Sequence, residues 1–146
     1  MTTPLTYVID GDAPPFVPRG WKVKEHKKNG KVVLDFSKIT LHLSPNQQEG
    51  RSIEGNELSK ELVSYLVHNA NVLDYLLAHP ELIPEDWKRD SEGNLRYIFF
   101  WGTKYHDSGG YPVVRCLYWF GGVWCWGDFW LDFRWRGYAP AAALAQ

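Results

Sequence analysis

The sequence predicts an α+β fold in a single domain spanning residues 1–146, in which N-terminal β-strands and two or three short helices precede a C-terminal, aromatic-rich antiparallel β-meander. Three observations support this prediction. Six of the eight tryptophans lie between residues 96 and 135, where Gly-containing turns divide aromatic and β-branched runs into three strand-length pieces. Apolar residues recur at helical spacing between residues 56 and 87. Before residue 45, apolar and polar residues alternate as in strands.

Four prolines and one glycine interrupt the first 19 residues, which we expect to form a turn-rich arm. The run IDGDAPP within it lacks the further ligands of a calcium loop, so we predict a turn there. The next segments, 21–25 and 31–36, flank Asn29-Gly30 and are therefore predicted to pair as a hairpin. A further strand is predicted over 39–43, with His42 on its water-facing side.

Capping residues divide the helical region. Asn56 is predicted to cap a first helix, and Asn71 a second one that stops before Pro80. Pro84 is expected at the first position of a last short helical segment. His68 and His79 then lie near helix C-termini, where the helix dipole favours a cation.

Gly121-Gly122 is predicted to be the two-residue loop of the main hairpin, and this fixes which residues share a face. On one face the opposed pairs are Trp119–Trp124, Leu117–Trp126 and Arg115–Asp128. On the other they are Tyr118–Cys125 and Val114–Phe129.

One face of this sheet is expected to pack on both helices. The other is either covered by the N-terminal strands or partly exposed as an aromatic platform, and coverage is favoured because soluble monomers seldom expose large apolar patches. The alternative is a binding surface formed by Trp119, Trp124, Trp126, Trp130, Arg115, Asp128, Asp132 and Arg134. Arg115 and Asp128 have a purely structural interpretation as well, that of a cross-strand ion pair.

Composition narrows the function classes. A net charge of −1 argues against nucleic acid as a partner, and no apolar run approaches a membrane helix. The five lysines between residues 22 and 31 are interpreted as a solvated edge. Cys116 and Cys125 are expected to be buried free thiols of a cytoplasmic protein, and no metal or cofactor is predicted.

Three hypotheses for function follow. The first is a macromolecular interaction module, with a protein as partner, that uses the aromatic sheet, because Trp, Tyr and Arg dominate binding hot spots. The second is a carbohydrate- or small-ligand-binding domain in which the rings stack on the ligand. The third is an enzyme, with His106 and Asp107 or Asp128 and Asp132 as candidates, although no spacing supports general acid–base pairing.

The last residues, 140–146, are predicted to form a frayed, flexible tail. Several segments resemble a family of small bacterial hypothetical proteins without assigned activity. They are SIEGNEL, NANVLDYLLAHPELIPEDWK, IFFWGTKY, VRCLYW, WLDFRW and PAA. The resemblance implies no ligand, cofactor or catalytic residue.

Overall fold

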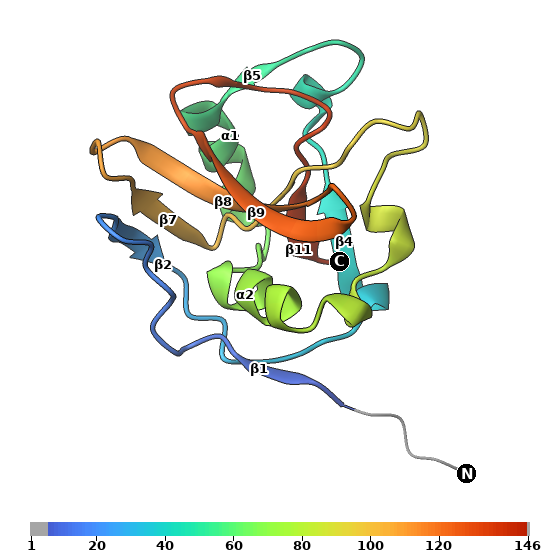
Figure 1. Ribbon diagram of the computed structural model, residues 1–146. Coiled ribbons are helices and arrows are strands. Elements are labelled where there is room, and N and C mark those ends of the chain that lie inside the picture. The colour runs from blue at the N-terminus through green and yellow to red at the C-terminus, as the bar shows by residue number, and fades with distance from the viewer. Residues whose placement is uncertain (1–5, 146) are drawn as a thin grey trace.

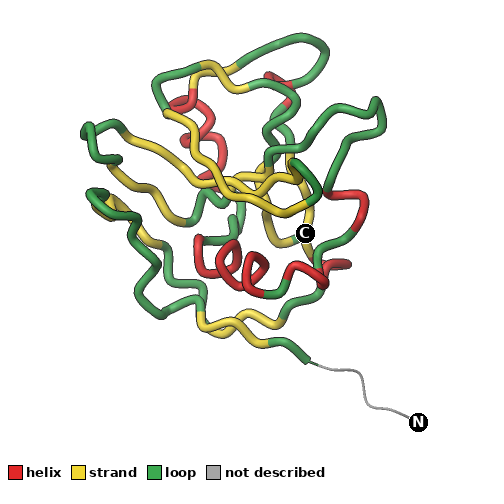
Figure 2. The backbone as a smooth tube through the Cα atoms, viewed as in Figure 1, coloured by secondary structure: helices red, strands yellow, loops and turns green. Residues whose placement is uncertain are grey.

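The structure is a computed structural model that describes residues 6–145, and its fold is mixed α+β. Most strands belong to one curled, mixed sheet with helices on both sides (Figures 1 and 2). Within the described residues its seven strands are β2 (Lys22–His26), β4 (Ile39–His42), β6 (Ile98–Phe99), β7 (Thr103–His106), β8 (Pro112–Phe120), β9 (Val123–Trp130) and β11 (Ala141–Leu144). Two smaller pairs are β1 (Val8–Asp10) with β3 (Lys31–Val33), and β5 (Ile53–Glu54) with β10 (Arg134–Trp135).

β8 is the central strand of the large sheet. One of its edges pairs with β9 along the whole length of both strands. Its other edge is shared, because β7 pairs near Val113 and β6 pairs near Leu117. From β7 the sheet continues to β2. From β6 it continues to β11, which runs parallel to β6, and then to β4, which runs antiparallel to β11. The predicted antiparallel meander thus exists as β7, β8 and β9.

The register of the β8–β9 hairpin agrees with the sequence prediction. Trp119 lies opposite Trp124 and Arg115 lies opposite Asp128. Gly121 and Gly122 adopt φ angles of 63° and 82°, the left-handed conformation that a type I′ turn requires at both central positions. The turn chemistry therefore sets which side chains share each face.

Two α-helices lie on opposite faces of this sheet: α1 (Gly55–Glu61) and α2 (Ala70–Ala78). Figure 1 shows the β8–β9 hairpin between them. Leu58 of α1 belongs to the same apolar cluster as Val114, whereas Leu73 of α2 packs in the cluster of Leu117. The expectation that one face packs on both helices is wrong, because successive residues of β8 send apolar side chains to both sides.

The caps of both helices lie upstream of the predicted ones. The Glu54 carboxylate accepts hydrogen bonds from the backbone N–H groups of Asn56 and Glu57, so Glu54 caps α1. Asn69 caps α2 by accepting from the Asn71 N–H group. α2 ends before Pro80 as predicted. Short 3₁₀ helices occupy Phe36–Lys38, Pro45–Gln47, Leu62–Ser64, Pro80–Leu82 and Glu85–Trp87.

The predicted N-terminal hairpin around Asn29-Gly30 does not form. β2 pairs with β7, and β3 pairs with β1. The Lys27 N–H group donates to the carbonyl of Gly102 at 2.7 Å, and the Asn29 amide donates to the carbonyl of Val67 at 3.2 Å. These two bonds direct β2 and β3 into different sheets, so a turn signal that is correct locally is overridden by distant partners.

The predicted C-terminal tail is also corrected. Ala141–Leu144 forms β11, which lies between β6 and β4, and the three alanines Ala141–Ala143 are buried. The prediction rested on the tendency of chain ends to fray, and the weak preference of alanine for strands gives no local signal against it. Here the small side chains fit an interior strand whose two faces contribute to two different apolar clusters of the core. Gln146 lies outside the described residues, as do Met1–Leu5 of the predicted arm.

The described part of the arm packs on α2 and reaches the large sheet at Phe16. Gly11 and Asp12 form the predicted turn, and the Tyr105 hydroxyl donates to the carbonyl of Phe16 at 2.8 Å. Within residues 6–145, no helix has the length and apolar character needed to cross a membrane.

Candidate binding surface on the C-terminal sheet

One face of the β8–β9 hairpin, which we call the tryptophan face, carries Val113, Arg115, Leu117, Trp119, Trp124, Trp126, Asp128 and Trp130. α2, Phe16 of the arm and Trp21, which precedes β2, pack over it. The Trp126 ring meets Trp21 edge to face at a centroid distance of 5.8 Å, and the Arg115 guanidinium lies 4.2 Å from the Trp126 ring centroid. All four tryptophans of this face are at least partly buried.

Arg115 is a structural residue. Its side chain is 1% exposed and donates two hydrogen bonds to the Asp74 carboxylate of α2, both at 2.9 Å. Burial disfavours the cation, but the bound Asp74 carboxylate outweighs this effect and raises the pKa of Arg115. The ion partner is therefore Asp74 rather than Asp128, the partner that the register suggested.

The remaining predicted site residues do not converge on one place. The Trp119 ring contacts Trp124 and has the Lys88 ammonium 3.8 Å from its centroid. Trp130 stacks on Tyr111 at 4.5 Å. Two predicted residues lie beyond the end of β9. The Asp132 carboxylate accepts from the Asn56 amide, and Arg134 donates to the hydroxyl and carbonyl of Ser52.

The opposite face is open over part of its length. A groove of about 380 Å³, which we call the tyrosine groove, is lined by Tyr97, Phe99, Cys116, Tyr118, Phe120, Gly127, Asp128, Phe129 and Tyr138. Gly127 keeps it open, because a Cβ atom at that position would lie 3.2 Å from the Tyr118 ring. α1 packs only on the inner end of this face, around Val114 and Cys116.

Three tyrosines give the groove its character. The Tyr97 and Tyr118 rings are 5.1 Å apart at an interplanar angle of 35°, and Tyr138 meets Tyr97 edge to face at 5.8 Å. No hydrogen bond joins their hydroxyls to any residue between 6 and 145. Burial is the main cause that raises the pKa of Tyr118. A protonated tyrosine hydroxyl can both donate and accept a hydrogen bond.

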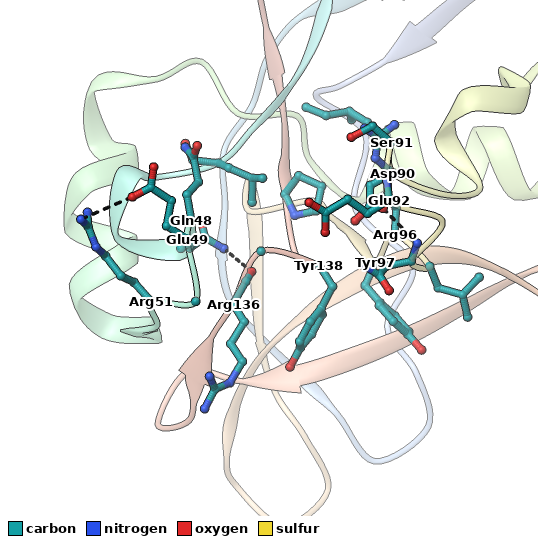
Figure 3. Close-up of a pocket in the computed structure, with 18 residues that line it drawn as sticks. Gln48, Glu49, Arg51, Asp90, Ser91, Glu92, Arg96, Tyr97, Arg136 and Tyr138 are labelled. Atoms are coloured by element: carbon teal, nitrogen blue, oxygen red, sulfur yellow. Dashed lines mark hydrogen bonds and ion pairs between the residues drawn. The ribbon is translucent and has the colours of Figure 1, made fainter.

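A polar cleft of about 890 Å³ adjoins the groove. It lies between the loop 41–51, the turn 90–97 and the segment 136–140 (Figure 3). Its charged lining residues are Glu49, Arg51, Asp90, Glu92, Arg96 and Arg136. Tyr97 and Tyr138 line both cavities, and Figure 3 shows Tyr138 between Arg136 and Tyr97. The cleft and the groove therefore form one continuous surface.

Local hydrogen bonds hold the walls of the cleft. The buried Gln47 amide donates to the carbonyls of Arg136 and Ala139, at 3.0 and 2.9 Å. The Asp90 carboxylate accepts from the N–H groups of Glu92 and Asn94, and the backbone of Asn94 is the main cause that lowers the pKa of Asp90. These contacts fix the turn and loop that present the charged side chains.

Some of these side chains have partners, whereas those of Glu92 and Arg136 form no hydrogen bond or ion pair with residues 6–145. Arg51 lies 3.7 Å from the Glu49 carboxylate, and Arg96 donates to the carbonyl of Asp86. The Arg136 guanidinium is therefore available to an external acceptor.

Two of the four candidate catalytic residues, Asp107 and Asp132, accept hydrogen bonds that hold neighbouring segments together. The Asp107 carboxylate accepts from the N–H groups of Gly109 and Tyr111, each at 2.9 Å, and so shapes the turn after β7. Burial and then Asp107 raise the pKa of Asp128, while Arg115 opposes them. Among residues 6–145, no group of three His, Cys, Asp or Glu side chains is placed to hold a metal ion.

Sequence reasoning missed Tyr97 and Tyr138. Tyr118 could be assigned to the face opposite the tryptophans from the hairpin register alone. The other two tyrosines join it through β6 and the segment before β11, whose pairing no local pattern indicates. Comparison of the chain with family models, curated proteins and solved structures found no match.

Proposed function

We propose that this protein is a binding module that recognises a protein partner through the tyrosine groove and the adjoining polar cleft. The observation that carries the proposal is the presence of three neighbouring tyrosines with unengaged hydroxyls on an open apolar groove. Tyrosine combines a large apolar ring with a polar tip, and it is enriched in interface hot spots. A groove of about 380 Å³ accommodates one or two apolar side chains as anchors.

The cleft adds a polar rim to this apolar centre, which is the usual anatomy of an interface. Three arginines and three carboxylates line it, so a partner that carries both signs of charge fits it better than a polyanion. Arg136 is the arginine without an internal partner, and we expect it to receive a carboxylate of the bound protein. The two free thiols support a location in the reducing cytoplasm.

A carbohydrate ligand is the second candidate. The Tyr97 and Tyr118 rings, 5.1 Å apart and inclined by 35°, offer a shallow platform for the apolar face of a sugar ring, with hydroxyls at its margin. Screening the purified protein on a glycan array separates the two candidates, because a glycan-binding protein gives saturable signals in the absence of any protein partner.

Affinity capture from a lysate with the full-length tagged chain tests the proposal, with nuclease present to remove nucleic acid bridges. The variant pair is Tyr118→Ala/Tyr138→Ala, and Val63→Ala serves as control because Val63 is 74% exposed and outside both cavities. We expect the unmodified chain and the control to retain the same stoichiometric protein, and the double tyrosine variant to lose it while remaining folded. Equal retention by all three proteins would contradict the proposed site.

A further inference from the structure

The outer edge of β9 is an unpaired strand edge. Phe120 and Val123 flank the two-residue turn and form a hydrogen-bonded pair, and the alternation of an antiparallel ladder continues from there. The backbone N–H and C=O groups of Trp124, Trp126 and Asp128 therefore point away from β8. β9 pairs with β8 alone, and no hydrogen bond from residues 6–145 reaches these six groups.

The other edges of the sheet are protected in ways that β9 is not. β2 carries Lys22 and Lys24, and its ladder is interrupted by a bulge between Val23 and Glu25. β4 is four residues long and is soon followed by Pro45. Lysines, bulges and short strands are the usual means by which edges avoid further pairing. β9 is eight residues long and contains neither lysine nor proline.

We propose that the edge of β9 pairs with the same edge of a second copy of this chain, antiparallel and centred on Trp126. In this register Trp126 faces Trp126 of the second copy, and Trp124 faces Asp128 of the second copy. Each of the three opposed pairs exchanges two backbone hydrogen bonds, so all the outward donors and acceptors are satisfied. The two sheets become one continuous sheet across a two-fold axis.

Side chains on both faces fit this register. On the groove side, Val123, which is 58% exposed, comes to lie opposite Phe129 of the second copy, and Cys125 comes to lie opposite Gly127. Phe133, 47% exposed, lies beside Phe129 and extends the apolar contact. The only charged residue of β9 is Asp128, and in this register it faces a tryptophan rather than another carboxylate.

These features favour a second copy over an unrelated strand. Any extended peptide satisfies the backbone groups, whereas an antiparallel second copy also brings the exposed Val123 of each chain against Phe129 of the other, next to the exposed Phe133. The pairing places the two tyrosine grooves on the same side of the joined sheet. It does not depend on what the grooves bind.

Sedimentation equilibrium of the full chain tests the pairing. We expect a concentration-dependent monomer–dimer equilibrium within the micromolar-to-millimolar range. Cys125→Lys places two lysines at diagonal positions across the axis, with Cα atoms roughly 7–8 Å apart, and their like charges should weaken the dimer by about tenfold or more. Val63→Lys is the matched control and should leave the dimer unchanged. A chain that stays monomeric throughout, or a dimer of equal affinity in the Cys125→Lys variant, overturns the proposal.

Thiol crosslinking of the unmodified chain gives a second test that needs no stable variant. Cys116 is 2% exposed, and burial raises the pKa of its thiol to about 12, so a short bismaleimide reacts with Cys125. We expect a covalent dimer whose linked peptide joins Cys125 to Cys125, and its yield should fall on dilution. Modification of Cys125 without any linked dimer, at concentrations where the chain sediments as a dimer, shows a different interface and overturns the pairing.

Discussion

The two faces of the β8–β9 hairpin are built from the same two strands and are both aromatic, yet they have different surroundings. The tryptophan face is partly covered by α2, the arm and Trp21, and its Arg115 binds Asp74 of α2. On the opposite face α1 reaches only the inner end, which leaves the tyrosine groove open. Aromatic density along a strand therefore does not identify a binding surface. The segments that lie over each face decide it.

The largest expected effect tests the contact that attaches α2 to the tryptophan face. Asp74→Ala leaves the buried Arg115 cation without its carboxylate, which should lower the free energy of unfolding by about 3 kcal/mol or more. Urea unfolding measures this loss. The matched control is Glu57→Ala, which removes the exposed Lys60–Glu57 ion pair at 3.2 Å and should cost less than about 1 kcal/mol. Equal losses in the two variants would show that α2 does not depend on this ion pair.

A smaller loss is expected within the tryptophan face itself. Trp126→Ala removes the ring that lies between Trp21 and Arg115. Since the ring is only partly buried, unfolding in urea should show a loss of about 2 kcal/mol rather than the full cost of a core tryptophan. A variant as stable as the unmodified chain would place Trp126 on a free surface, as the sequence first suggested.

The pH dependence of stability distinguishes the two faces. His68 lies just before α2, the helix that packs on the tryptophan face, whereas no histidine lines the tyrosine groove. Burial lowers the pKa of His68, and burial, opposed by Glu61, also lowers that of His42. The unfolded chain therefore takes up protons at a higher pH than the folded chain. The free energy of unfolding should be highest at pH values above the ordinary histidine pKa. It should decrease as the pH drops below that pKa, by at most about 1.4 kcal/mol per pH unit for each histidine.

Urea unfolding across this range measures the slope. His68→Leu should reduce the slope just below the ordinary histidine pKa and leave the contribution of His42 in place. Tyr118→Ala should leave the slope unchanged, since that side chain lies in the groove. A His68→Leu variant with the slope of the unmodified chain would show that His68 is free to bind a proton in the folded state.

The smallest effect on stability is expected in the groove. Tyr118→Ala removes a ring that packs on Tyr97 but has no cover above it, so unfolding in urea should show a loss of less than about 1 kcal/mol. The same substitution should weaken partner binding strongly. A loss as large as that of Trp126→Ala would mean that Tyr118 belongs to the core.

The parts of the fold that local chemistry determines could be predicted from the sequence. The register of β8 and β9 follows from Gly121-Gly122, and the end of α2 follows from Pro80. What could not be predicted depends on partners distant in sequence. β2 reaches β7 across more than 70 residues, and Ala141–Leu144 enters the sheet between β6 and β4.

The same limit applies to the candidate site. Trp124, Trp126 and Trp130 stand out in the sequence because they are dense in one strand, and the fold partly buries them. Tyr97 and Tyr138 are 41 residues apart in the chain and meet only when β6 and the segment before β11 come together. Single residues scattered along a chain give no local signal of a shared groove.

Side-chain NMR of the labelled protein during titration with its captured partner tests the central claim most directly. The account predicts that the ring signals of Tyr97, Tyr118 and Tyr138 shift while the indole N–H signals of Trp124 and Trp126 stay in place. Shifts of these indole signals, with the tyrosine rings unchanged, would contradict it and assign binding to the tryptophan face.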